Sequence, residues 1–287
     1  MAADPVAALL ALLRGKTLTS VPGCWDGLSA LLIEQAGFPA AFVTGGGVAM
    51  GRFGRPDIGL VTASELVETL AAIRDRVAIP LIVDGDTGFG GVANMARTVR
   101  SLERAGAGAI QIEDQTFPKR CGHMAGKAVV PLVEAVDRVR AALDTRNRML
   151  VVARTDALAC EGLEAALDRA DAYLAAGADA IFVEGPRTMA ELTAVAERFR
   201  GRAPLIHNLV EGGVTPTQDG TVLEKMGFAV ALHPLLLMHG LVAAAPGWLG
   251  HLADRRGTQG LPLADLATMN RITGAADLIA WGDRHGG

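Results

Sequence analysis

The sequence predicts an α/β fold, a (β/α)8 parallel barrel with a C-terminal helical extension. Eight short apolar segments recur along the 287 residues, in alternation with segments of helical periodicity, which is typical of a parallel sheet. The apolar segments are continuous rather than alternating, as expected when strands are covered on both faces. A doubly wound open sheet is the alternative, but the glycine fingerprint of dinucleotide-binding folds is absent from the first strand–helix turn. The barrel is therefore the favoured architecture.

The elements follow one another in that order. A helix over 5–13 precedes a strand at 18–22, and Asp26 is placed to cap a helix over 27–36. A strand at 40–44 runs into three glycines, and a helix from Ser64 to about 76 begins with an acidic first turn. Further strands are expected at 80–83, 109–112, 149–153, 180–183, 204–207 and 228–231. Helices fill the intervals at 92–105, 132–143, 162–176, 189–199 and 218–226.

Length and composition bound the class of protein. We expect one domain over residues 1–287, with helices from about 246 to 287 used in oligomer contacts. The net charge of −4, without a basic stripe, argues against nucleic acid as a partner. Three distant cysteines and no signal-like N-terminus predict a reduced, cytoplasmic protein. The longest apolar run, 229–245, is interrupted by His233, Pro234, His239 and Gly240, so we expect no membrane span.

Polar side chains stand at or just past the ends of successive predicted strands. They are Thr44, Asp84, Asp86, Glu113, Arg154, Glu184 and Asn208. Each alone has a structural explanation, such as a helix cap, a solvated loop or an ion pair. Because the carboxyl ends of barrel strands meet at one rim, their joint occurrence predicts an active site there.

Three of these residues indicate a metal. Asp84, Asp86 and Glu113 supply oxygen ligands with no histidine pair or cysteine cluster among them, which suits Mg²⁺, with Mn²⁺ as a substitute, better than Zn²⁺. Asp57 is a further carboxylate on a Gly/Pro-rich loop, where it is equally explained as a turn-stabilising residue.

The segment Lys119-Arg120-Cys121-Gly122-His123 indicates acid–base chemistry. Its cations and imidazole predict a lowered pKa for the Cys121 thiol and a role in proton transfer, whereas a lone cysteine is more often a small buried hydrophobe. Gly122 and Gly126 suggest a mobile loop. Cys24 and Cys160 are expected to serve in packing. The run 45–47 is either a flexible turn or, with Thr44, a set of backbone N–H donors for an anionic substrate oxygen.

These segments together resemble the isocitrate lyase/phosphoenolpyruvate mutase superfamily over nearly the whole chain. The matching stretches are 44–49, 56–59, 84–90, 112–115, 119–123 and 153–157. The Lys-Arg-Cys-Gly-His form is similar to the methylisocitrate lyase and 2,3-dimethylmalate lyase branches.

The resemblance implies a barrel whose last helix is exchanged between subunits, in a homotetramer built as a dimer of helix-swapped dimers. It implies Mg²⁺ near Asp84, with Asp57, Asp86 and Glu113 acting directly or through waters. Arg154 would bind a 2-oxo acid, supported by Thr44, Gly45 and Gly46. Gly122, His123, Glu184 and Asn208 would contact the rest of a small carboxylate substrate, and Cys121 would donate a proton.

The expected reaction is cleavage of a C–C bond in a 2-hydroxy dicarboxylate, giving a 2-oxo acid such as pyruvate and a carboxylate. Lys119, Arg120 and His123 would stabilise the developing charge. Phe42, Val210, Leu236 and His239 stand where polar partners of a third carboxylate are usual in the methylisocitrate branch, which favours a substituted malate. The alternatives are 2-methylisocitrate lyase (pyruvate plus succinate), then oxaloacetate decarboxylase or a phosphonate-forming mutase. A non-catalytic binding barrel would not need these carboxylates or Cys121.

Overall fold

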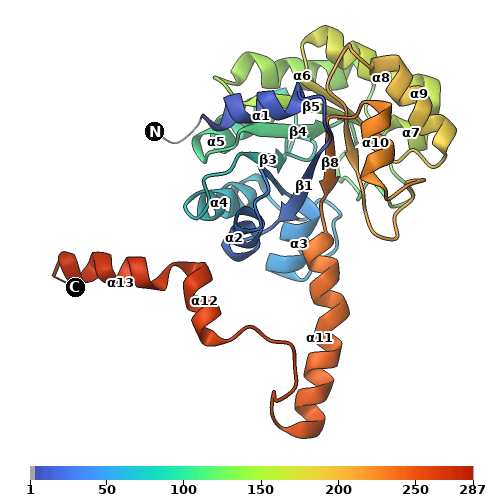
Figure 1. Ribbon diagram of the computed structural model, residues 1–287. Helices are drawn as coiled ribbons and strands as arrows, with labels where there is room; N and C mark the ends of the chain where they lie inside the picture. The colour runs from blue at the N-terminus through green and yellow to red at the C-terminus, as the bar shows by residue number, and fades with distance from the viewer. Residues whose placement is uncertain (1–3, 287) are drawn as a thin grey trace. The chain divides into compact units, whose positions relative to one another are not determined.

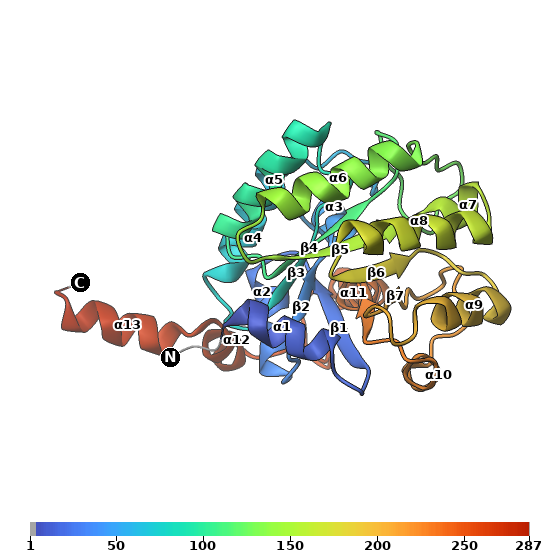
Figure 2. The ribbon, with the colours of Figure 1, turned by 90° about the horizontal axis from the view of Figure 1, so that it is seen from above.

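Eight parallel strands form the centre of the protein, in a computed structural model that describes residues 4–286 (Figure 1). Their order is β6-β5-β4-β3-β2-β1-β8-β7, and a parallel bridge between Ile181 and Leu205 joins the two ends. The sheet therefore closes into a barrel, with helices α4, α5, α6 and α8 around its outside (Figure 2). The predicted (β/α)8 fold is confirmed.

The bounds of the elements are as follows. The strands are β1 Thr19–Cys24, β2 Ala41–Val43, β3 Leu81–Asp84, β4 Ala109–Glu113, β5 Leu150–Thr155, β6 Ala180–Val183, β7 Ile206–Asn208 and β8 Val230–His233. The helices of the barrel are α1 Pro5–Leu13, α2 Gly27–Gln35, α3 Gly45–Phe53, α4 Ala63–Arg74, α5 Val92–Arg104, α6 Leu132–Thr145, α7 Ala157–Cys160, α8 Leu163–Ala176, α9 Met189–Phe199 and α10 Gly220–Met226. Helices α11 Leu236–Arg255, α12 Leu266–Thr273 and α13 Ala275–Arg284 follow.

The inside of the barrel is apolar, and one end of it is closed. Side chains such as Phe42, Val152 and Phe182 pack against one another within it, and Leu9 and Leu13 of α1 belong to the same buried cluster. Burying side chains of this size contributes roughly 1.5–3 kcal/mol each. Because α1 packs against this core, polar chemistry is confined to the other end, where the strands terminate at their carboxyl ends.

The glycine run 45–47 is the first turn of α3, and a free loop is the wrong interpretation. Thr44 caps this helix by accepting a hydrogen bond from the N–H of Gly47 at 3.3 Å. A Cβ on Gly47 would lie 2.6 Å from Thr44 Cγ2, and one on Gly45 would lie 3.1 Å from Asp84 Oδ2. These glycines are required for close packing against the strand ends, which a pattern of residue types does not reveal.

The chain separates into two compact units, one up to Leu236 and one from Leu237 onward. Nearly all of α11 belongs to the second unit, because this helix continues through Pro246. The expected use of the C-terminal helices in oligomer contacts stays a prediction. By length and composition alone, α11 is also the one helix in the described part of the chain that could cross a membrane, which is weak evidence for such a location. The expectation of no membrane partner stays a prediction.

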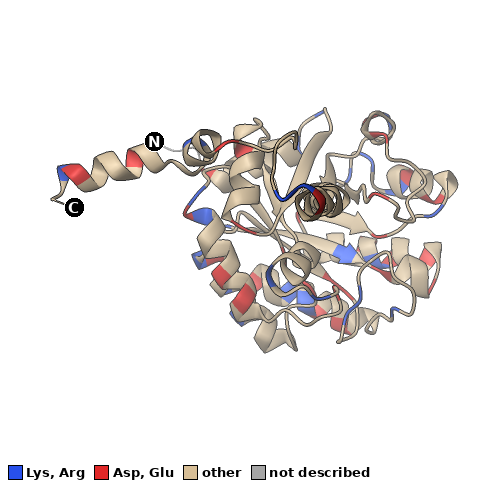
Figure 3. Cartoon of the chain, turned by 90° about the horizontal axis from the view of Figure 1, so that it is seen from below, with Lys and Arg blue, Asp and Glu red and all other residues tan. Residues whose placement is uncertain are grey.

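Charged residues of both signs are interspersed along the outer helices of the barrel (Figure 3). This distribution agrees with the net charge of −4 and with the absence of a basic stripe in the sequence.

Candidate active site

Four carboxylates gather around the Lys119 ammonium at the ends of β3 and β4. Lys119 Nζ lies 2.5 Å from Asp57 Oδ1 and 2.8 Å from Asp86 Oδ1. Asp84 accepts a hydrogen bond from the N–H of Gly45 at 3.3 Å, at the N-terminus of α3, where a negative charge is stabilised. Asp86 has a left-handed backbone with φ 46°, which is uncommon outside glycine and found at functional sites. The four predicted metal ligands thus belong to one cluster, with Glu113 at the end of β4 as the fourth.

Burial dominates the electrostatics of this cluster. It raises the pKa of Asp86 to about 7, against the opposing effect of Lys119 and with a further contribution from Asp84. It also raises the pKa of Glu113 well above its ordinary value. Burial alone would lower the pKa of Lys119, but Asp86 and Asp57 outweigh it and hold that pKa well above the ordinary value. Lys119 is therefore a permanent cation, while Asp86 and Glu113 resist becoming anions.

The donor atoms suit a hard divalent cation, although they are not gathered into a preformed site. Among residues 4–286, no three His, Cys, Asp or Glu side chains converge closely enough to hold a metal by themselves. Within the same residues, Glu113 Oε1 and Gln111 Oε1 are buried without a hydrogen-bond partner, and Asp86 Oδ1 has only its ion pair with Lys119. Buried polar atoms are normally satisfied, so these oxygens indicate a missing ligand. Oxygen donors without sulfur or imidazole match Mg²⁺ or Mn²⁺.

Arg154 lies beside this cluster, in register with Glu113 on the neighbouring strand. Asp156 holds the guanidinium from one side, with Nε 2.9 Å from Oδ2 and Nη2 3.0 Å from Oδ1. The remaining nitrogen, Nη1, lies 3.3 Å from Glu184 Oε2 and 3.5 Å from Glu113 Oε2. A bidentate contact fixes the plane of a guanidinium, so Nη1 has a defined direction toward the strand ends.

Behind Asp156 lies a second buried carboxylate, Asp114. It accepts hydrogen bonds from the Thr155 hydroxyl at 2.7 Å, the Asp156 N–H at 2.9 Å and the Tyr173 hydroxyl at 2.7 Å. These bonds anchor the end of β5, from which Arg154 projects. Arg154 is thus positioned by two layers of buried hydrogen bonds.

The segment 119–127 covers the strand ends. The Cys121 N–H donates to the carbonyl of Asp57 at 3.1 Å, and a Cβ on Gly122 would lie 2.4 Å from Arg154 Nη2. Burial raises the pKa of the Cys121 thiol, and Asp57 and Glu184 add to that effect. Our expectation of a lowered thiol pKa is therefore wrong, because it weighed the neighbouring cations and not the burial. A raised pKa keeps the thiol protonated at neutral pH, as a proton donor requires.

His123 contacts the loop that carries Val214 and the carboxylate of Glu184 at the end of β6. Its Nδ1 accepts a hydrogen bond from the N–H of Val214 at 3.1 Å, and its Nε2 lies 3.5 Å from Glu184 Oε1. Burial lowers the pKa of His123 and Glu184 opposes this only in part, so the ring is neutral at pH 7. With Nδ1 accepting, the proton of the neutral ring belongs on Nε2.

A small cavity of about 60 Å³ lies within the rim, and the larger concavity of about 550 Å³ lies away from these carboxylates. The small cavity is lined by Phe42, Thr44, Gly46, Met50, Asp57, Asp84, Gln111, Lys119, Cys121, Gly122, His123, Arg154, Asn208, Val210, Pro234 and Leu235. Ligand pockets usually measure roughly 300–1,000 Å³, so the segment over this cavity is closed down. We assign the site to the small cavity because it contains the reactive groups.

Several sequence interpretations need correction. The Arg120 side chain is exposed and donates to the carbonyl of Ala125, so it holds the loop and, in the described structure, lies outside the cavity lining. Leu236, at the end of the first unit, is also absent from that lining among the described residues. Cys24 is buried as expected, whereas Cys160 is exposed and does not serve in packing.

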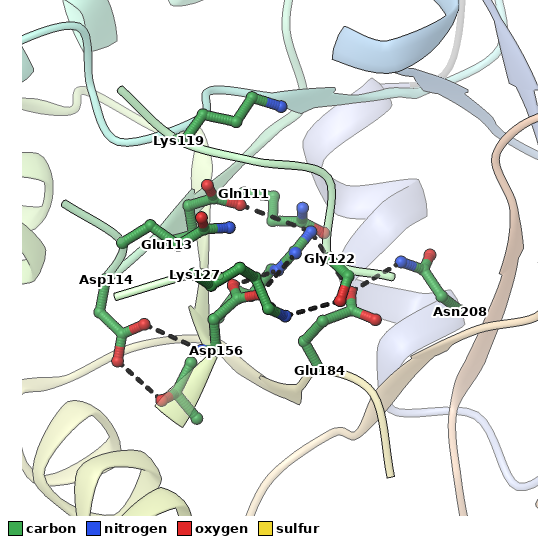
Figure 4. Close-up of polar contacts among 12 residues, drawn as sticks. Gln111, Glu113, Asp114, Lys119, Gly122, Lys127, Asp156, Glu184 and Asn208 are labelled. Atoms are coloured by element: carbon green, nitrogen blue, oxygen red, sulfur yellow. Dashed lines mark hydrogen bonds and ion pairs between the residues drawn. The ribbon is translucent and has the colours of Figure 1, made fainter. Parts of the chain in front are cut away.

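Sequence reasoning also missed residues at the site. Lys127 bridges Gly122 and Asp156 (Figure 4). Gln111 donates to Asp84, and Met50 lines the cavity. The position of Gln111 inside a strand, two residues before Glu113, was the one available signal for a polar residue facing inward.

Comparison with known proteins identifies the family of this chain. A family model described as phosphoenolpyruvate phosphomutase matches residues 9–245. The 2-methylisocitrate lyase of Salmonella typhimurium is 44% identical over 247 residues, 84% of this chain and 82% of the relative. The 2,3-dimethylmalate lyase of Eubacterium barkeri is 41% identical over 233 residues, 80% of each chain. The chain belongs to the phosphoenolpyruvate mutase/isocitrate lyase superfamily.

Solved structures of this superfamily show the same architecture. A crystal structure of 2,3-dimethylmalate lyase superposes with a TM-score of 0.93 at 33% identity, covering 99% of this chain and 96% of that one. A phosphonopyruvate hydrolase in complex with oxalate and Mg²⁺ has a TM-score of 0.89 at 28% identity, covering 99% of this chain and 100% of that one. The relatives named 2-methylisocitrate lyase and 2,3-dimethylmalate lyase are carbon–carbon lyases, and this chain is an enzyme of that superfamily class.

Proposed function

We propose that this enzyme cleaves the C–C bond of a substituted malate, similar to 2,3-dimethylmalate, into a 2-oxo acid such as pyruvate and a second carboxylate. The observation that carries this proposal is the mixed lining of the cavity. Carboxylates, Lys119 and Arg154 line it together with the apolar side chains of Phe42, Met50 and Val210. A dicarboxylate with an alkyl substituent matches both kinds of group.

The carboxylates of Asp57, Asp84, Asp86 and Glu113 would hold Mg²⁺, for which Mn²⁺ can substitute. Six carboxylates are buried or nearly so at these strand ends, namely Asp57, Asp84, Asp86, Glu113, Asp156 and Glu184, beside the three cations Lys119, Lys127 and Arg154. Burial raises the pKa of Asp86 and of Glu113, and a divalent cation would allow both to ionise by offsetting negative charge that is otherwise expensive to bury. When bound, Mg²⁺ polarises the hydroxyl and the carbonyl oxygen that forms from it.

The residues of the chain supply the remaining chemistry. Arg154 Nη1, held in place by Asp156, binds the carboxylate of the 2-oxo acid half. The substrate hydroxyl gives its proton to a carboxylate of the cluster around Lys119 as its oxygen becomes the carbonyl of the 2-oxo acid. The C–C bond breaks, and its electron pair passes to the departing carboxylate fragment as an enolate, which Lys119 and the hydrogen-bond donors around it stabilise. The protonated thiol of Cys121 then gives its proton to that carbon. A neutral His123 donates from Nε2 and adds no charge at neutral pH.

The cavity lining favours two carboxylates over three. Lys119 and Arg154 are its cations within the described residues, and His123 has a lowered pKa. A third carboxylate buried without a partner would be strongly disfavoured. The second candidate is 2-methylisocitrate lyase, because several relatives carry that name, including the Salmonella enzyme at 44% identity.

A coupled assay of 2-oxo acid release tests the proposal. Purified enzyme with Mg²⁺ is supplied with 2,3-dimethylmalate, other alkyl malates, 2-methylisocitrate, isocitrate and oxaloacetate, and kcat/KM is measured for each. We expect the alkyl malates to give the highest values, with Cys121→Ser as the inactive control. If kcat/KM is highest with 2-methylisocitrate, the enzyme is assigned as a 2-methylisocitrate lyase instead. If none of the substrates releases a 2-oxo acid, a lyase of this type is contradicted.

We also infer a homotetramer with exchanged C-terminal helices. The second unit exposes large apolar side chains, including Leu249 at 67%, Leu278 at 60% and Ile279 at 64%. Such residues are usual at subunit contacts and unusual on a free surface. Light scattering of the purified protein should give four chains, and a truncation before Leu237 should lose that state. A full-length monomer would contradict the inference.

A further inference from the structure

Lys127 connects the segment that carries Cys121 to the strand end that carries Arg154. Its Nζ donates to the carbonyl of Gly122 at 2.6 Å and to Asp156 Oδ1 at 2.6 Å (Figure 4). The side chain is only 2% exposed, and Asp156 is fully buried. A buried ammonium is stable only with such partners, so these contacts determine where the end of the segment lies.

Asp156 is shared between two cations. The same Oδ1 that accepts from Lys127 also accepts from Arg154 Nη2 at 3.0 Å, while Oδ2 accepts from Arg154 Nε at 2.9 Å. Arg154 thus keeps two hydrogen bonds to Asp156 whether or not Lys127 is present. Within residues 4–286, by contrast, Lys127 has one charged partner, and its other acceptor is the carbonyl of Gly122, next to Cys121.

The segment has to move for a substrate to enter. The cavity beneath it measures about 60 Å³, far below the size of an ordinary ligand pocket. Gly122 packs directly on the residues beneath, since a Cβ there would lie 2.4 Å from Arg154 Nη2 and 2.7 Å from the Glu184 carboxyl carbon. Lifting Gly122 necessarily stretches or breaks the bond from Lys127 Nζ to its carbonyl.

We propose that Lys127 is a positioning residue that latches the 119–127 segment closed by linking the Gly122 carbonyl to Asp156. The effect of this latch on turnover rests on the proposed function, in which closure of the segment brings the Cys121 thiol to the substrate. Lys127 does not bind the substrate itself. Substrate binding is assigned to Arg154, which stays oriented by its own hydrogen bonds to Asp156. Loss of the latch therefore impairs proton delivery more than substrate binding.

The closing experiment measures the opening of the segment directly. Alkylation of Cys121 by N-ethylmaleimide is followed by peptide mass spectrometry in a Cys160→Ser background, where Cys24 is fully buried. Lys127→Met keeps the length of the side chain and removes its donors, Lys127→Arg keeps the charge, and Lys225→Met removes an exposed lysine as the matched control. Measurements are made well below the thermal midpoint of each variant.

We expect Lys127→Met to label roughly tenfold to a hundredfold faster than its parent, as the loss of one charge-assisted buried hydrogen bond permits. Removing a nearby cation would by itself raise the pKa of a thiol and slow its labelling, so faster labelling reports opening. Lys127→Arg should fall between the two, and Lys225→Met should equal the parent. Equal labelling of Lys127→Met and its parent would overturn the latch.

Kinetics separate a latch from a general structural role. With a substrate identified by the 2-oxo acid assay, Lys127→Met should lose roughly tenfold to a hundredfold in kcat while KM changes by less than about threefold. A fall in thermal midpoint with kcat per folded molecule unchanged would contradict the proposal. If the parent turns over none of the substrates tested, the proposed function fails, yet the labelling ratio still decides whether Lys127 latches the segment.

Discussion

Glu113 and Asp156 are buried carboxylates at the ends of adjacent strands, and they differ in almost every other respect. Both lie near Arg154, but Asp156 accepts two hydrogen bonds from Arg154 and a third from Lys127. Burial would raise the pKa of Asp156, but Arg154 and Lys127 outweigh it and hold that pKa below its ordinary range. Burial raises the pKa of Glu113 well above its ordinary value, and its Oε1 has no hydrogen-bond partner in the described structure.

This difference separates the rim into two parts. The β5 end, with Asp156 and Asp114 behind Arg154, is complete without a ligand and is preorganised to hold an anion. The β3–β4 end, with Asp84, Asp86 and Glu113, holds carboxylates whose full ionisation Lys119 alone does not offset, and it is completed by a cation. We infer that one part recognises the substrate and the other recruits the metal.

Metal removal should have the largest effect and tests the β3–β4 end. Chelation should abolish turnover, and Mg²⁺ or Mn²⁺ should restore it. Mg²⁺ at 100 times its dissociation constant should also stabilise the fold by about 2.7 kcal/mol, because it binds the folded state alone. Thermal unfolding with and without Mg²⁺ measures this, and Asp84→Asn should abolish the gain. Full activity after chelation, with no ion found by elemental analysis, would contradict the assignment of the β3–β4 end to metal binding.

Cys121→Ser comes next and tests the segment that lies over both parts. We expect kcat to fall by roughly 10²–10⁴-fold, the contribution of a positioned acid, with little change in thermal midpoint. Because the raised pKa keeps the thiol protonated, the alkaline loss of wild-type activity should occur as the pH rises above that pKa. The serine variant should lack this alkaline decline. Near wild-type turnover in Cys121→Ser would exclude the thiol as the donor.

A pair of substitutions addresses the comparison itself through stability. Asp156→Asn leaves Arg154 and Lys127 buried with too little negative charge, which should cost about 3–5 kcal/mol. Glu113→Gln, in metal-free protein, should change stability by less than about 1 kcal/mol or increase it, since Glu113 resists ionisation. Denaturant unfolding at pH 7 measures both free energies. Equal losses in the two variants would show that the carboxylates have the same role.

The smallest expected effect concerns His207, which lies in the middle of β7 and outside both parts of the rim. Its ring is 1% exposed, and neither nitrogen has a hydrogen-bond partner among the described residues. Burial lowers its pKa from 6.5 to about 4. The unfolded chain therefore binds a proton before the folded one does, and stability is lost as the pH falls from about 6.5 to about 4, by roughly 3 kcal/mol at most.

His207→Leu should lack this component. The difference in unfolding free energy between wild type and His207→Leu, measured from pH 7 to pH 4, should shift against the wild type as the pH falls. Using the difference removes the contribution of Asp86, whose raised pKa acts with the opposite sign. A difference that is constant with pH would mean that His207 is solvated or paired in the folded protein.

The sequence was sufficient for the barrel and for most of the rim. Apolar runs between helical segments predict strands covered on both faces, and a polar residue at the end of each run predicts the rim, as at Asp84, Glu113 and Arg154. Such patterns are local, and the closed parallel sheet brings the strand ends together whatever the sequence distance.

Other features depend on contacts that no local pattern contains. Lys127 meets Asp156 across 29 residues of sequence, and only the fold brings them together. The pKa of Cys121 is raised by burial of the thiol in the folded protein, and this effect outweighs that of the neighbouring cations. The glycines at 45–47 are compatible with a flexible turn in the sequence. What requires them is close packing against Thr44 and Asp84, which is a tertiary contact.

Proton release on Mg²⁺ binding tests the central claim most directly. If Asp86 and Glu113 hold protons in the metal-free enzyme and lose them to the cation, binding near pH 7 must release protons. Calorimetric titration of metal-free protein with Mg²⁺, in two buffers of different ionisation enthalpy, counts them. We predict binding with net proton release in the wild type and in Cys121→Ser, and the loss of that release in the double variant Asp86→Asn/Glu113→Gln. Mg²⁺ binding without proton release, or unchanged binding and release in the double variant, would contradict the account.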